Sequence, residues 1–371
     1  MLSRKEFLAI VASMVASNLL PSNAFANDDE LTVLSPENAQ AIANNLLSCT
    51  KPGFTCIPSE PIKFYDTSGK AQGYIVEFYR ADTPYGYVVI DSQTTGLISS
   101  YSFSKNRAGP ATQLRASRNA HLNQSEMHVI MLNPLEFGLV DNDGVMRLNT
   151  NRTISLNNIP QPSSLPSSWG DVMVGMGEVY SNFTILKENY SGEVRGISEA
   201  TVEASTGRYA CAVTALMLAS ELHGISSIYS NPNDYLKLWE LTETKPLPES
   251  AQTKPGIILG STTNSKCGPG YSRFTKSKGT TTSSYYVSNA LYSTFQSHVD
   301  SKGYSLIHGR LENGGNIGHV MTVQGYATIR QNQTGNTNQM LVVADGWYME
   351  PVCLNVKAQY YSYIDATLLY R

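Results

Sequence analysis

Cys211 stands where a helix is expected to begin, a position that suits a nucleophilic thiol. Residues 205–224 carry apolar side chains around most of a helix circumference, and Gly224 stands where a helix would stop. Gly207 interrupts the pattern, so we expect the helix to start near Cys211. A helix N-terminus favours thiolate over thiol by roughly 0.3–1 kcal/mol, and the thiolate is the nucleophile. The N–H groups of the same turn can also donate to an oxyanion.

His319 is the histidine best placed to act as a base toward that thiol. It follows Gly318 at the start of a strand-like segment, and a second such segment spans residues 340–345. A hairpin through residues 331–339 would make the two strands antiparallel and bring Asp345 level with His319. Asp345 would then accept a hydrogen bond from the imidazole and orient it. Taken singly, these residues could be an ordinary sheet histidine and a turn former, but together with a lone cysteine at a helix start they favour catalysis.

The other five histidines receive structural interpretations. His223 lies at the far end of the helix, about 18 Å from Cys211 at 1.5 Å per residue, where it would complement the helix dipole. His308 lies within a predicted strand and is the reserve base. No partner can be named for His121, His128 and His298. Neither a Cys-x-x-Cys nor a His-Glu-x-x-His spacing occurs, so we expect no metal and no cofactor.

The first 26 residues have the pattern of a signal peptide. Arg4 and Lys5 begin it, residues 7–20 are apolar, and Ala24 and Ala26 fit the small-x-small cleavage pattern. The apolar stretch is shorter than the ~20 residues that span a bilayer, which disfavours the alternative of a membrane anchor. We therefore expect cleavage after Ala26, no membrane span in the mature chain, and a secreted, periplasmic or cell-surface location.

The five cysteines fit an exported protein with one thiol left over. In an oxidising compartment pairs of cysteines become disulfides. Cys49 and Cys56 could close a small loop, and Cys267 and Cys353 could pair across the C-terminal half. Cys211 would remain alone, either as a small buried hydrophobe or as the nucleophile.

Elements before residue 157 predict a small α+β unit, which we expect to be a prosegment at residues 27–156. Ser35 and Pro36 resemble an N-cap and first helical residue, followed by helical spacing over residues 37–47. Strands are predicted at residues 62–66, 73–79 and 85–91, with a turn at residues 67–70 and a Pro/Gly turn before residue 85.

A second unit is predicted at residues 171–371. Residues 157–170 contain three prolines and four serines and no charged side chain, which indicates a linker or processing segment. Beyond it, a nucleophile helix would pack against an antiparallel sheet, so the fold class is α+β. The predicted strands of this sheet are residues 304–309, 320–326, 340–345 and 358–370.

Composition excludes several classes of protein. Apolar residues make up 41% of the chain and charged residues 15%, values that rule out a disordered, collagenous or coiled-coil chain. The net charge is −3 and no basic block occurs, so nucleic acid is not an expected partner.

The motifs around the three candidate residues resemble those of bacterial papain-like cysteine peptidases, in particular the streptopain family and the related bacteriocin-processing type. The motifs are YACAVTAL at Cys211, GHVMTVQGY at His319 and VVADGW at Asp345. The segment from residue 61 to residue 104 is also similar to the prosegment of streptopain-like zymogens.

This resemblance implies a papain-like peptidase domain preceded by a prodomain that inhibits it. Cys211 would be the nucleophile, His319 the base and later the acid, and Asp345 the group that orients the imidazole. Trp347 would shield the bond between His319 and Asp345 from water.

Two features depart from the family pattern. Papain has a Gln six residues before the nucleophile that completes the oxyanion hole, whereas this chain has Ser205, with Glu203 and Thr206 as polar neighbours. Ser205 and Thr206 are therefore the candidate side-chain donors. Streptopain also has Trp-Gly-Trp-Gly-Gly where this chain has residues 345–349, DGWYM, and an Asp can accept from an imidazole as an Asn would.

The sequence thus predicts an exported cysteine endopeptidase, made as a zymogen, that cleaves a peptide or protein substrate through a thioester. One alternative is a transglutaminase-like or amidase-like acyl transferase, because such enzymes share the Cys, His, Asp order. Another is a non-catalytic exported binding protein on a degenerate peptidase scaffold, since Tyr-rich and Asn-rich loops suit surface contact.

Overall fold

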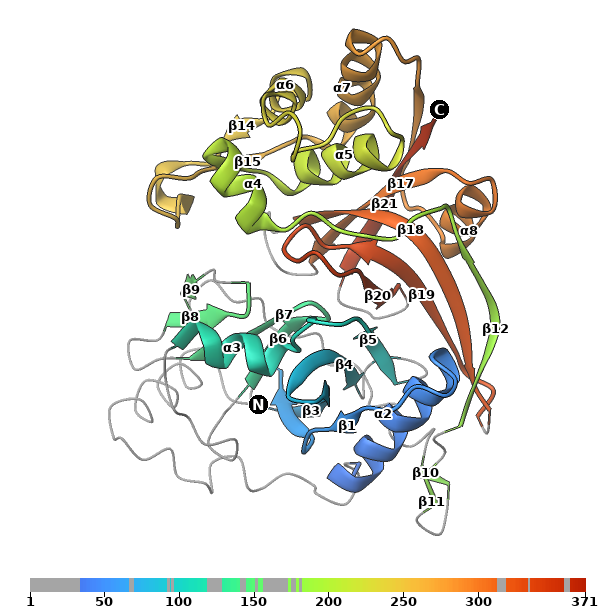
Figure 1. The fold of residues 1–371 in the computed structure, drawn as a ribbon. Coiled ribbons are helices and arrows are strands. Elements are labelled where there is room, and N and C mark those ends of the chain that lie inside the picture. Colours follow the sequence, from blue (N-terminus) through green and yellow to red (C-terminus); the bar gives the residue numbers. More distant parts are fainter. Residues whose placement is uncertain are drawn as a thin grey trace. The chain divides into compact units, whose positions relative to one another are not determined.

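A computed structural model gives the arrangement of the chain (Figure 1). It describes residues 34–66, 70–91, 94, 97–118, 129–140, 145–150, 153–155, 173–174, 178–179, 182–311, 318–332, 334–356 and 361–371. The expected signal peptide, the expected linker at residues 157–170, and His121 and His128 lie outside these residues. The described chain mixes helices with a mainly antiparallel sheet, which confirms the predicted α+β class.

The chain forms two compact units. Unit 1 comprises Met1–Ile185, Ile329–Asn338 and Lys357–Tyr360, and unit 2 comprises Leu186–Thr328, Gln339–Val356 and Tyr361–Arg371. Cys211, His319 and Asp345 all belong to unit 2.

In the part of unit 1 that the structure describes, two helices accompany a sheet. The helices are α2 (Pro36–Thr50) and α3 (Pro110–Arg118), and the strands are β1 (Ile57–Pro58), β2 (Ile62–Tyr65), β3 (Ala71–Arg80), β4 (Thr83–Asp91), β5 (Ile98–Ser102), β6 (Val129–Asn133), β7 (Glu136–Val140), β8 (Val145–Leu148) and β9 (Thr153–Ser155). The strand order is β5-β4-β3-β2-β6-β7-β8-β9, with β1 on β3. Only the β2–β6 pair among these described ladders is parallel. Strands β10 (Met173–Val174) and β11 (Glu178–Val179) form a separate ladder.

The start of α2 confirms the prediction from the sequence. The N–H of Asn38 donates to the Ser35 hydroxyl oxygen at 3.3 Å, and Pro36 takes the first helical position, where its missing N–H costs no hydrogen bond. The helix buries a stripe at three- and four-residue spacing, formed by Ala39, Ile42, Ala43, Leu46 and Leu47.

The hairpin between β3 and β4 turns before residue 85, as predicted, although the turn does not use Pro84 or Gly86. Arg80 pairs with Thr83, so the turn is the two residues Ala81 and Asp82, with φ of 47° and 62°. Two positive φ values match the type I′ turn that suits the twist of a hairpin, although Asn and Gly are its usual residues. Pro84 and Gly86 instead lie within β4.

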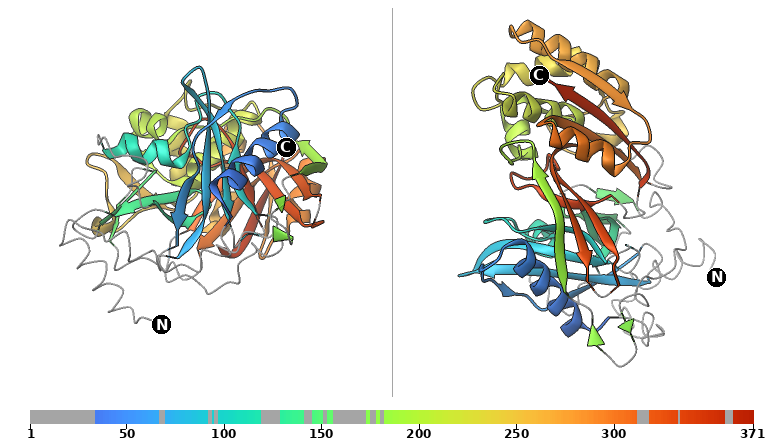
Figure 2. Two further views of the ribbon diagram at one scale, coloured as in Figure 1. Left: turned by 90° about the horizontal axis from the view of Figure 1, so that it is seen from below. Right: turned by 90° about the vertical axis from the view of Figure 1, so that its right-hand side faces the viewer.

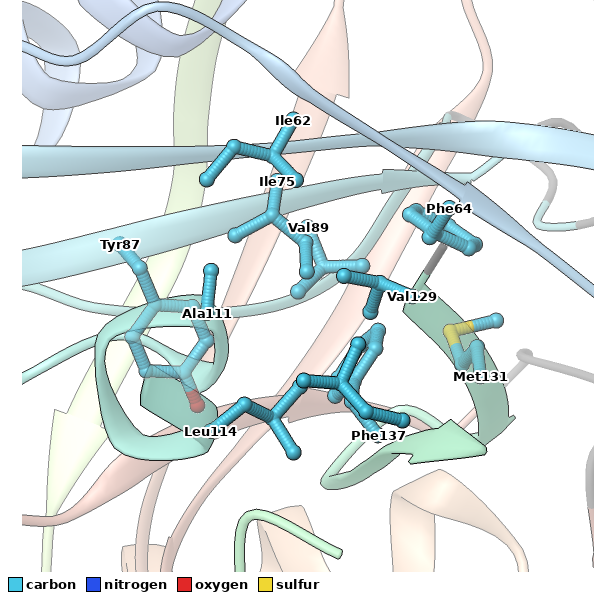
Figure 3. Close-up of a cluster of buried hydrophobic side chains, with 11 residues drawn as sticks. Ile62, Phe64, Ile75, Tyr87, Val89, Ala111, Leu114, Val129, Met131 and Phe137 are labelled. Atoms are coloured by element: carbon cyan, nitrogen blue, oxygen red, sulfur yellow. The ribbon is translucent and has the colours of Figure 1, made fainter. Parts of the chain in front are cut away.

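One hydrophobic cluster of unit 1 lies between its sheet and α3 (Figure 3). Strands β2, β3, β4, β6 and β7 contribute most of it, and α3 contributes two side chains. Its members are Ile62, Phe64, Ile75, Tyr87, Val89, Ala111, Leu114, Val129, Met131, Phe137 and Leu139.

Unit 2 combines a second sheet with a group of helices. Its helices are α4 (Glu199–Thr206), α5 (Cys211–Leu222), α6 (Asn233–Leu241), α7 (Asn264–Ser277) and α8 (Tyr292–Asp300), with a 3₁₀ turn at Glu249–Ala251. The strand order of the sheet is β16 (Ser283–Val287), β21 (Tyr361–Tyr370), β17 (Tyr304–Leu311), β18 (Gly318–Gln331), β19 (Thr337–Ala344) and β20 (Val352–Asn355). Strand β12 (Phe183–Tyr190) also pairs with β18. Strands β13 (Arg208–Tyr209), β15 (Ile258–Ser261) and β14 (Lys245–Pro246) form a small separate sheet.

The helices of unit 2 brace the helix that begins at Cys211. Helices α5, α6 and α7 pack on one another, α5 contacts β17, and α7 contacts β16 and β21 (Figures 1 and 2). The predicted helix boundaries are confirmed: α5 starts at Cys211, and Gly224 beyond its end has a φ of 63°. The four predicted strands are confirmed as β17, β18, β19 and β21.

Among the residues that the structure describes, neither of the disulfide pairings that the cysteine spacing suggested is present. The described part of the chain contains no disulfide bond, although it includes all five cysteines. Cys267 is fully buried in α7, where burial, with a smaller effect of the nearby Cys211, raises the pKa of its thiol to about 12. Spacing along a sequence does not determine the separation of Cα atoms in the fold, which decides whether two cysteines can bridge.

None of the helices in the described residues combines the length and the apolar character that crossing a bilayer requires.

Candidate active site

Helix α5 presents Cys211 at its first position. Residues 212–220 are all buried, so the helix is held by packing along almost its whole length. The Thr322 hydroxyl on β18 donates to the carbonyl oxygen of Ala215 at 2.9 Å, which ties α5 to the strand that carries His319. The position of Cys211 relative to His319 is therefore set by the core of unit 2.

The surroundings of Cys211 favour the thiolate. Burial alone would raise the pKa of its thiol, but a hydrogen bond with His319 and the charge of the imidazole lower it. The backbone N–H groups of Val320 and Ala212 lower it further, and the net pKa lies below the ordinary value. A buried thiol without such partners would behave in the opposite way, as Cys267 does.

His319 is held in one orientation by the residue that follows β19. It lies in β18 after Gly318, opposite Gly309 of β17. Its Nε2–H donates to the backbone carbonyl oxygen of Asp345 at 2.7 Å. Because a carbonyl oxygen can only accept, Nε2 carries the proton in this bond, and Nδ1 is the ring nitrogen left to exchange a proton with Cys211.

Trp347 covers one face of the His319 ring. The two rings stack with centroids 4.1 Å apart and planes inclined by 11°, and Trp347 is itself buried. An indole face attracts a cation, so this contact stabilises the imidazolium form of His319. It also keeps water from that face of the ring.

Asp345 builds the turn that aims the carbonyl oxygen at His319. The residue is buried, and its carboxylate Oδ1 accepts the backbone N–H groups of Trp347 at 2.9 Å and Tyr348 at 3.0 Å. Gly346, between Asp345 and Trp347, has a φ of 75°. The sequence predicted that the Asp345 side chain would orient the imidazole, whereas the bond to Nε2 comes from the main chain of the same residue.

Two tyrosines that the sequence analysis missed also belong to this region. The Tyr209 hydroxyl donates to the carbonyl oxygen of Gly346 at 3.3 Å, which links the strand before Cys211 to the turn after Asp345. Burial raises the pKa of Tyr209, so its phenol stays protonated and can donate. The hydroxyl of Tyr235 lies against the first turn of α5. Tyr209 stands two residues before the cysteine and could have been noticed, but nothing in the sequence connects Tyr235 to the site.

Ser205 and Thr206, the predicted side-chain donors to an oxyanion, lie on α4, and their contacts differ from those that the prediction requires. The Thr206 hydroxyl donates to the carbonyl oxygen of Val202 at 2.8 Å and accepts from the N–H of Arg208 at 3.2 Å, so it closes the C-terminal turn of α4. Ser205 is exposed on the same helix. The helix geometry leaves the backbone N–H of Cys211 as a donor for an oxyanion.

The remaining described histidines have structural roles. Burial lowers the pKa of His308 to about 4, and its Nε2 is hydrogen-bonded to the Thr367 hydroxyl at 2.8 Å. Burial, reinforced by Arg371, also lowers the pKa of His223 to about 4, so the prediction that this residue complements the helix dipole as a cation was wrong. His298 donates from Nε2 to backbone carbonyl oxygens of β17 and β21 at 3.0 and 3.1 Å.

The sequence matches no protein-family model and no curated protein. The functional assignment therefore depends on the geometry around Cys211 and on the resemblance of its motifs.

Proposed function

We propose that unit 2 is a papain-like cysteine peptidase domain that hydrolyses peptide bonds through a thioester on Cys211. The observation that carries this proposal is the coupling of Cys211 to His319, which lowers the pKa of a thiol that burial would otherwise raise. A structural cysteine needs no such partner, whereas a nucleophile does.

The first half of the reaction forms the acyl enzyme. The Cys211 thiolate attacks the carbonyl carbon of the substrate, and the oxygen that becomes negative accepts the N–H of Cys211 at the start of α5. His319, protonated on Nδ1, gives that proton to the leaving nitrogen as the carbon–nitrogen bond breaks. The products of this half are a free amine and a thioester, and His319 is left neutral.

The second half releases the acid. Neutral His319 takes a proton from a water molecule through Nδ1, and the hydroxide attacks the thioester carbon. The carbon–sulfur bond then breaks, which returns Cys211 as a thiolate and leaves His319 protonated. Throughout both halves the Nε2–H stays on the Asp345 carbonyl oxygen, so the ring does not rotate away from the sulfur.

Trp347 supports the charged form of the base. Stacking of the indole on the imidazolium is worth about 0.5–2 kcal/mol in comparable pairs. This adds to the thiolate–imidazolium attraction that keeps both partners charged near neutral pH.

The zymogen part of the proposal concerns unit 1. It has its own hydrophobic core, as a separately folded prosegment needs, and it precedes unit 2 along most of the chain. In this proposal residues 27–156 inhibit the peptidase until the segment at residues 157–170 is cut, and the chain is exported by its first 26 residues. The substrate is a peptide or protein.

Chemical labelling of the full-length protein tests the proposal. A peptidyl epoxide that alkylates cysteine peptidases should modify Cys211, and fluorogenic peptides should be hydrolysed. The Cys211→Ala variant should lose both reactions and should also lose conversion to a shorter form. Cys267→Ala is the matched control, because its deeply buried thiol has a raised pKa and should not react.

The outcomes separate the proposed activity from its alternatives. Hydrolysis that survives in Cys211→Ala contradicts the proposal. An added primary amine that captures the acyl group in preference to water would show an acyl transferase. If the Cys211 thiol does not react with the epoxide and its pKa is that of an ordinary thiol, a non-catalytic binding protein is favoured.

A further inference from the structure

The helix that carries Cys211 has no N-cap side chain of its own. Its N-cap residue is Ala210, with extended backbone (φ −146°, ψ 125°), and no side chain of the capping residue bonds to the first turn. Alanine is among the poorest N-cap residues because it leaves the first N–H groups without an acceptor. The backbone of the N-cap residue itself is held by a group from another helix.

That group is the phenol of Tyr235, which reaches the N-terminus of α5 from α6. The N–H of Ala210 donates to the Tyr235 hydroxyl oxygen at 2.9 Å, and the hydroxyl donates to the carbonyl oxygen of Ala210 at 3.3 Å. The Thr214 hydroxyl lies 3.1 Å from the same oxygen and can donate to it. One fully buried phenol thus satisfies both backbone groups of the N-cap residue.

The carbonyl of Ala210 and the N–H of Cys211 belong to one peptide group. A trans peptide is planar, so these two bonds point in opposite directions and move together. The Ala210 carbonyl oxygen is held on the core side by the Tyr235 hydroxyl and by the N–H of Thr214 at 2.9 Å. Fixing that oxygen fixes the direction of the Cys211 N–H.

We propose that Tyr235 is a positioning residue that aims the backbone N–H of Cys211 at the oxyanion of the reaction. It does not touch the reacting atoms and acts through the peptide group of Ala210 and Cys211. This inference rests on the proposed peptidase function for its kinetic consequence, but the orientation of the peptide group can be measured without it. The pKa of Tyr235 is raised by burial and, to a lesser extent, by the nearby Cys211, which agrees with a protonated phenol close to the nucleophile.

The test compares Tyr235→Phe with Tyr271→Phe in the full-length protein. Tyr271 is also a fully buried tyrosine, and its hydroxyl bonds to Nδ1 of His223 at the opposite end of α5, at 2.7 Å. Each substitution removes one phenolic oxygen and leaves buried polar groups without that partner. The two variants should therefore lose similar amounts of thermal stability, and only their effects on chemistry should differ.

For peptide hydrolysis, kcat of Tyr235→Phe should fall about 10- to 100-fold with little change in KM, because an oxyanion donor acts mainly on the transition state. Tyr271→Phe should keep the wild-type kcat. The rate of Cys211 alkylation by iodoacetamide should stay close to wild type in both variants, since that substitution forms no oxyanion. Hydrogen exchange of the amides at residues 207–214 should rise in Tyr235→Phe alone.

A second variant protects the test against a folding failure of the first. Thr214→Val keeps the side-chain volume but removes a hydroxyl that bonds to Tyr235, and it should lower kcat less than Tyr235→Phe does. The effects of the two changes should not add in the double variant, because both act on one hydrogen-bonded unit.

Two results would overturn the inference. One is a Tyr235→Phe protein that folds and keeps kcat within twofold of wild type. The other is equal hydrogen exchange at residues 207–214 in wild type and variant. If wild-type protein hydrolyses no peptide, the proposed function fails instead, and hydrogen exchange still decides the role of Tyr235.

Discussion

Substitutions at Asp345 can show whether its backbone carbonyl oxygen or its negatively charged side chain orients His319. If the carbonyl oxygen of Asp345 holds His319, the carboxylate matters because it shapes the turn, and an Asn side chain can shape it too. We expect Asp345→Asn to retain the two hydrogen bonds from the N–H groups of Trp347 and Tyr348, since its Oδ1 is also an acceptor. Asp345→Ala removes both.

The magnitude follows from these contacts. A hydrogen bond to a charged acceptor contributes about 1.5–3 kcal/mol, and a buried N–H without a partner costs about 1–3 kcal/mol. Loss of both bonds in Asp345→Ala would release the turn that keeps the carbonyl oxygen 2.7 Å from Nε2 of His319. Misplacement of a catalytic group by about 1 Å can cost about 100-fold in rate.

For Asp345→Ala we therefore expect kcat/KM to fall by about 10²-fold or more, and for Asp345→Asn by less than about tenfold. The assay is hydrolysis of a fluorogenic peptide across a pH series, with thermal unfolding as a check on folding. Equal, severe losses in the two variants would refute the reasoning. That result would mean that the negative charge, rather than the turn, orients the imidazole, as in triads where Asp to Asn costs about 10⁴-fold.

Four further predictions follow from the described contacts. His319→Gln should raise the pKa of the Cys211 thiol, because burial then acts without the opposing imidazole, and the midpoint of iodoacetamide alkylation should move to higher pH. Trp347→Leu should shift the alkaline limb of the kcat/KM profile down by about 0.4–1.5 pH units, because loss of the stacking destabilises the imidazolium. The folded pKa of His308 is about 4 against 6.5 in the unfolded chain, so its neutral form stabilises the fold fully above pH 6.5, and this stabilisation is lost as pH falls toward 4. In denaturant titrations, the free energy of unfolding of His308→Gln should therefore fall by up to about 3 kcal/mol less than that of the wild type between pH 6.5 and pH 4. Gly86→Ala should destabilise unit 1 by more than about 2 kcal/mol, measured by thermal unfolding, because the φ there is 115° and a Cβ would lie 1.8 Å from a carbonyl oxygen of β5.

Helices with local signals could be predicted from the sequence. The start of α2 depends on Ser35 and Pro36, and the end of α5 on Gly224, all within a turn of the boundary that they set. Strands such as β17 to β19 also showed their pattern, because apolar runs between turn residues need no distant information.

Elements whose stability comes from distant contacts could not be predicted. Helix α7 contains Gly268, Pro269 and Gly270, which individually argue against a helix. The glycines are used for close packing: a Cβ on Gly268 would lie 2.5 Å from the Ser284 hydroxyl, and one on Gly270 would lie 2.6 Å from the Thr242 methyl. Such packing becomes visible only when the neighbouring elements are known.

The candidate site also contains residues that the sequence indicates and contacts that only the fold shows. Cys211, His319 and Asp345 could be chosen from the sequence because side-chain chemistry and strand order point to them. The contact from Asp345 to His319 uses a backbone carbonyl oxygen, and every residue has one. Tyr235 lies 24 positions after Cys211 on another helix, and its role depends on packing between α5 and α6.

In the proposed mechanism, one short turn performs three tasks for His319. Its carbonyl oxygen fixes the tautomer, its Trp347 covers the ring, and its Asp345 side chain holds the turn in shape. These tasks require a tight turn with an acceptor side chain at its first position and an aromatic residue two positions later. The sequence Asp-Gly-Trp meets that requirement without reproducing the Trp-Gly-Trp-Gly-Gly pattern of streptopain. The geometry of the turn, more than the identity of its residues, therefore governs whether His319 can act as the base.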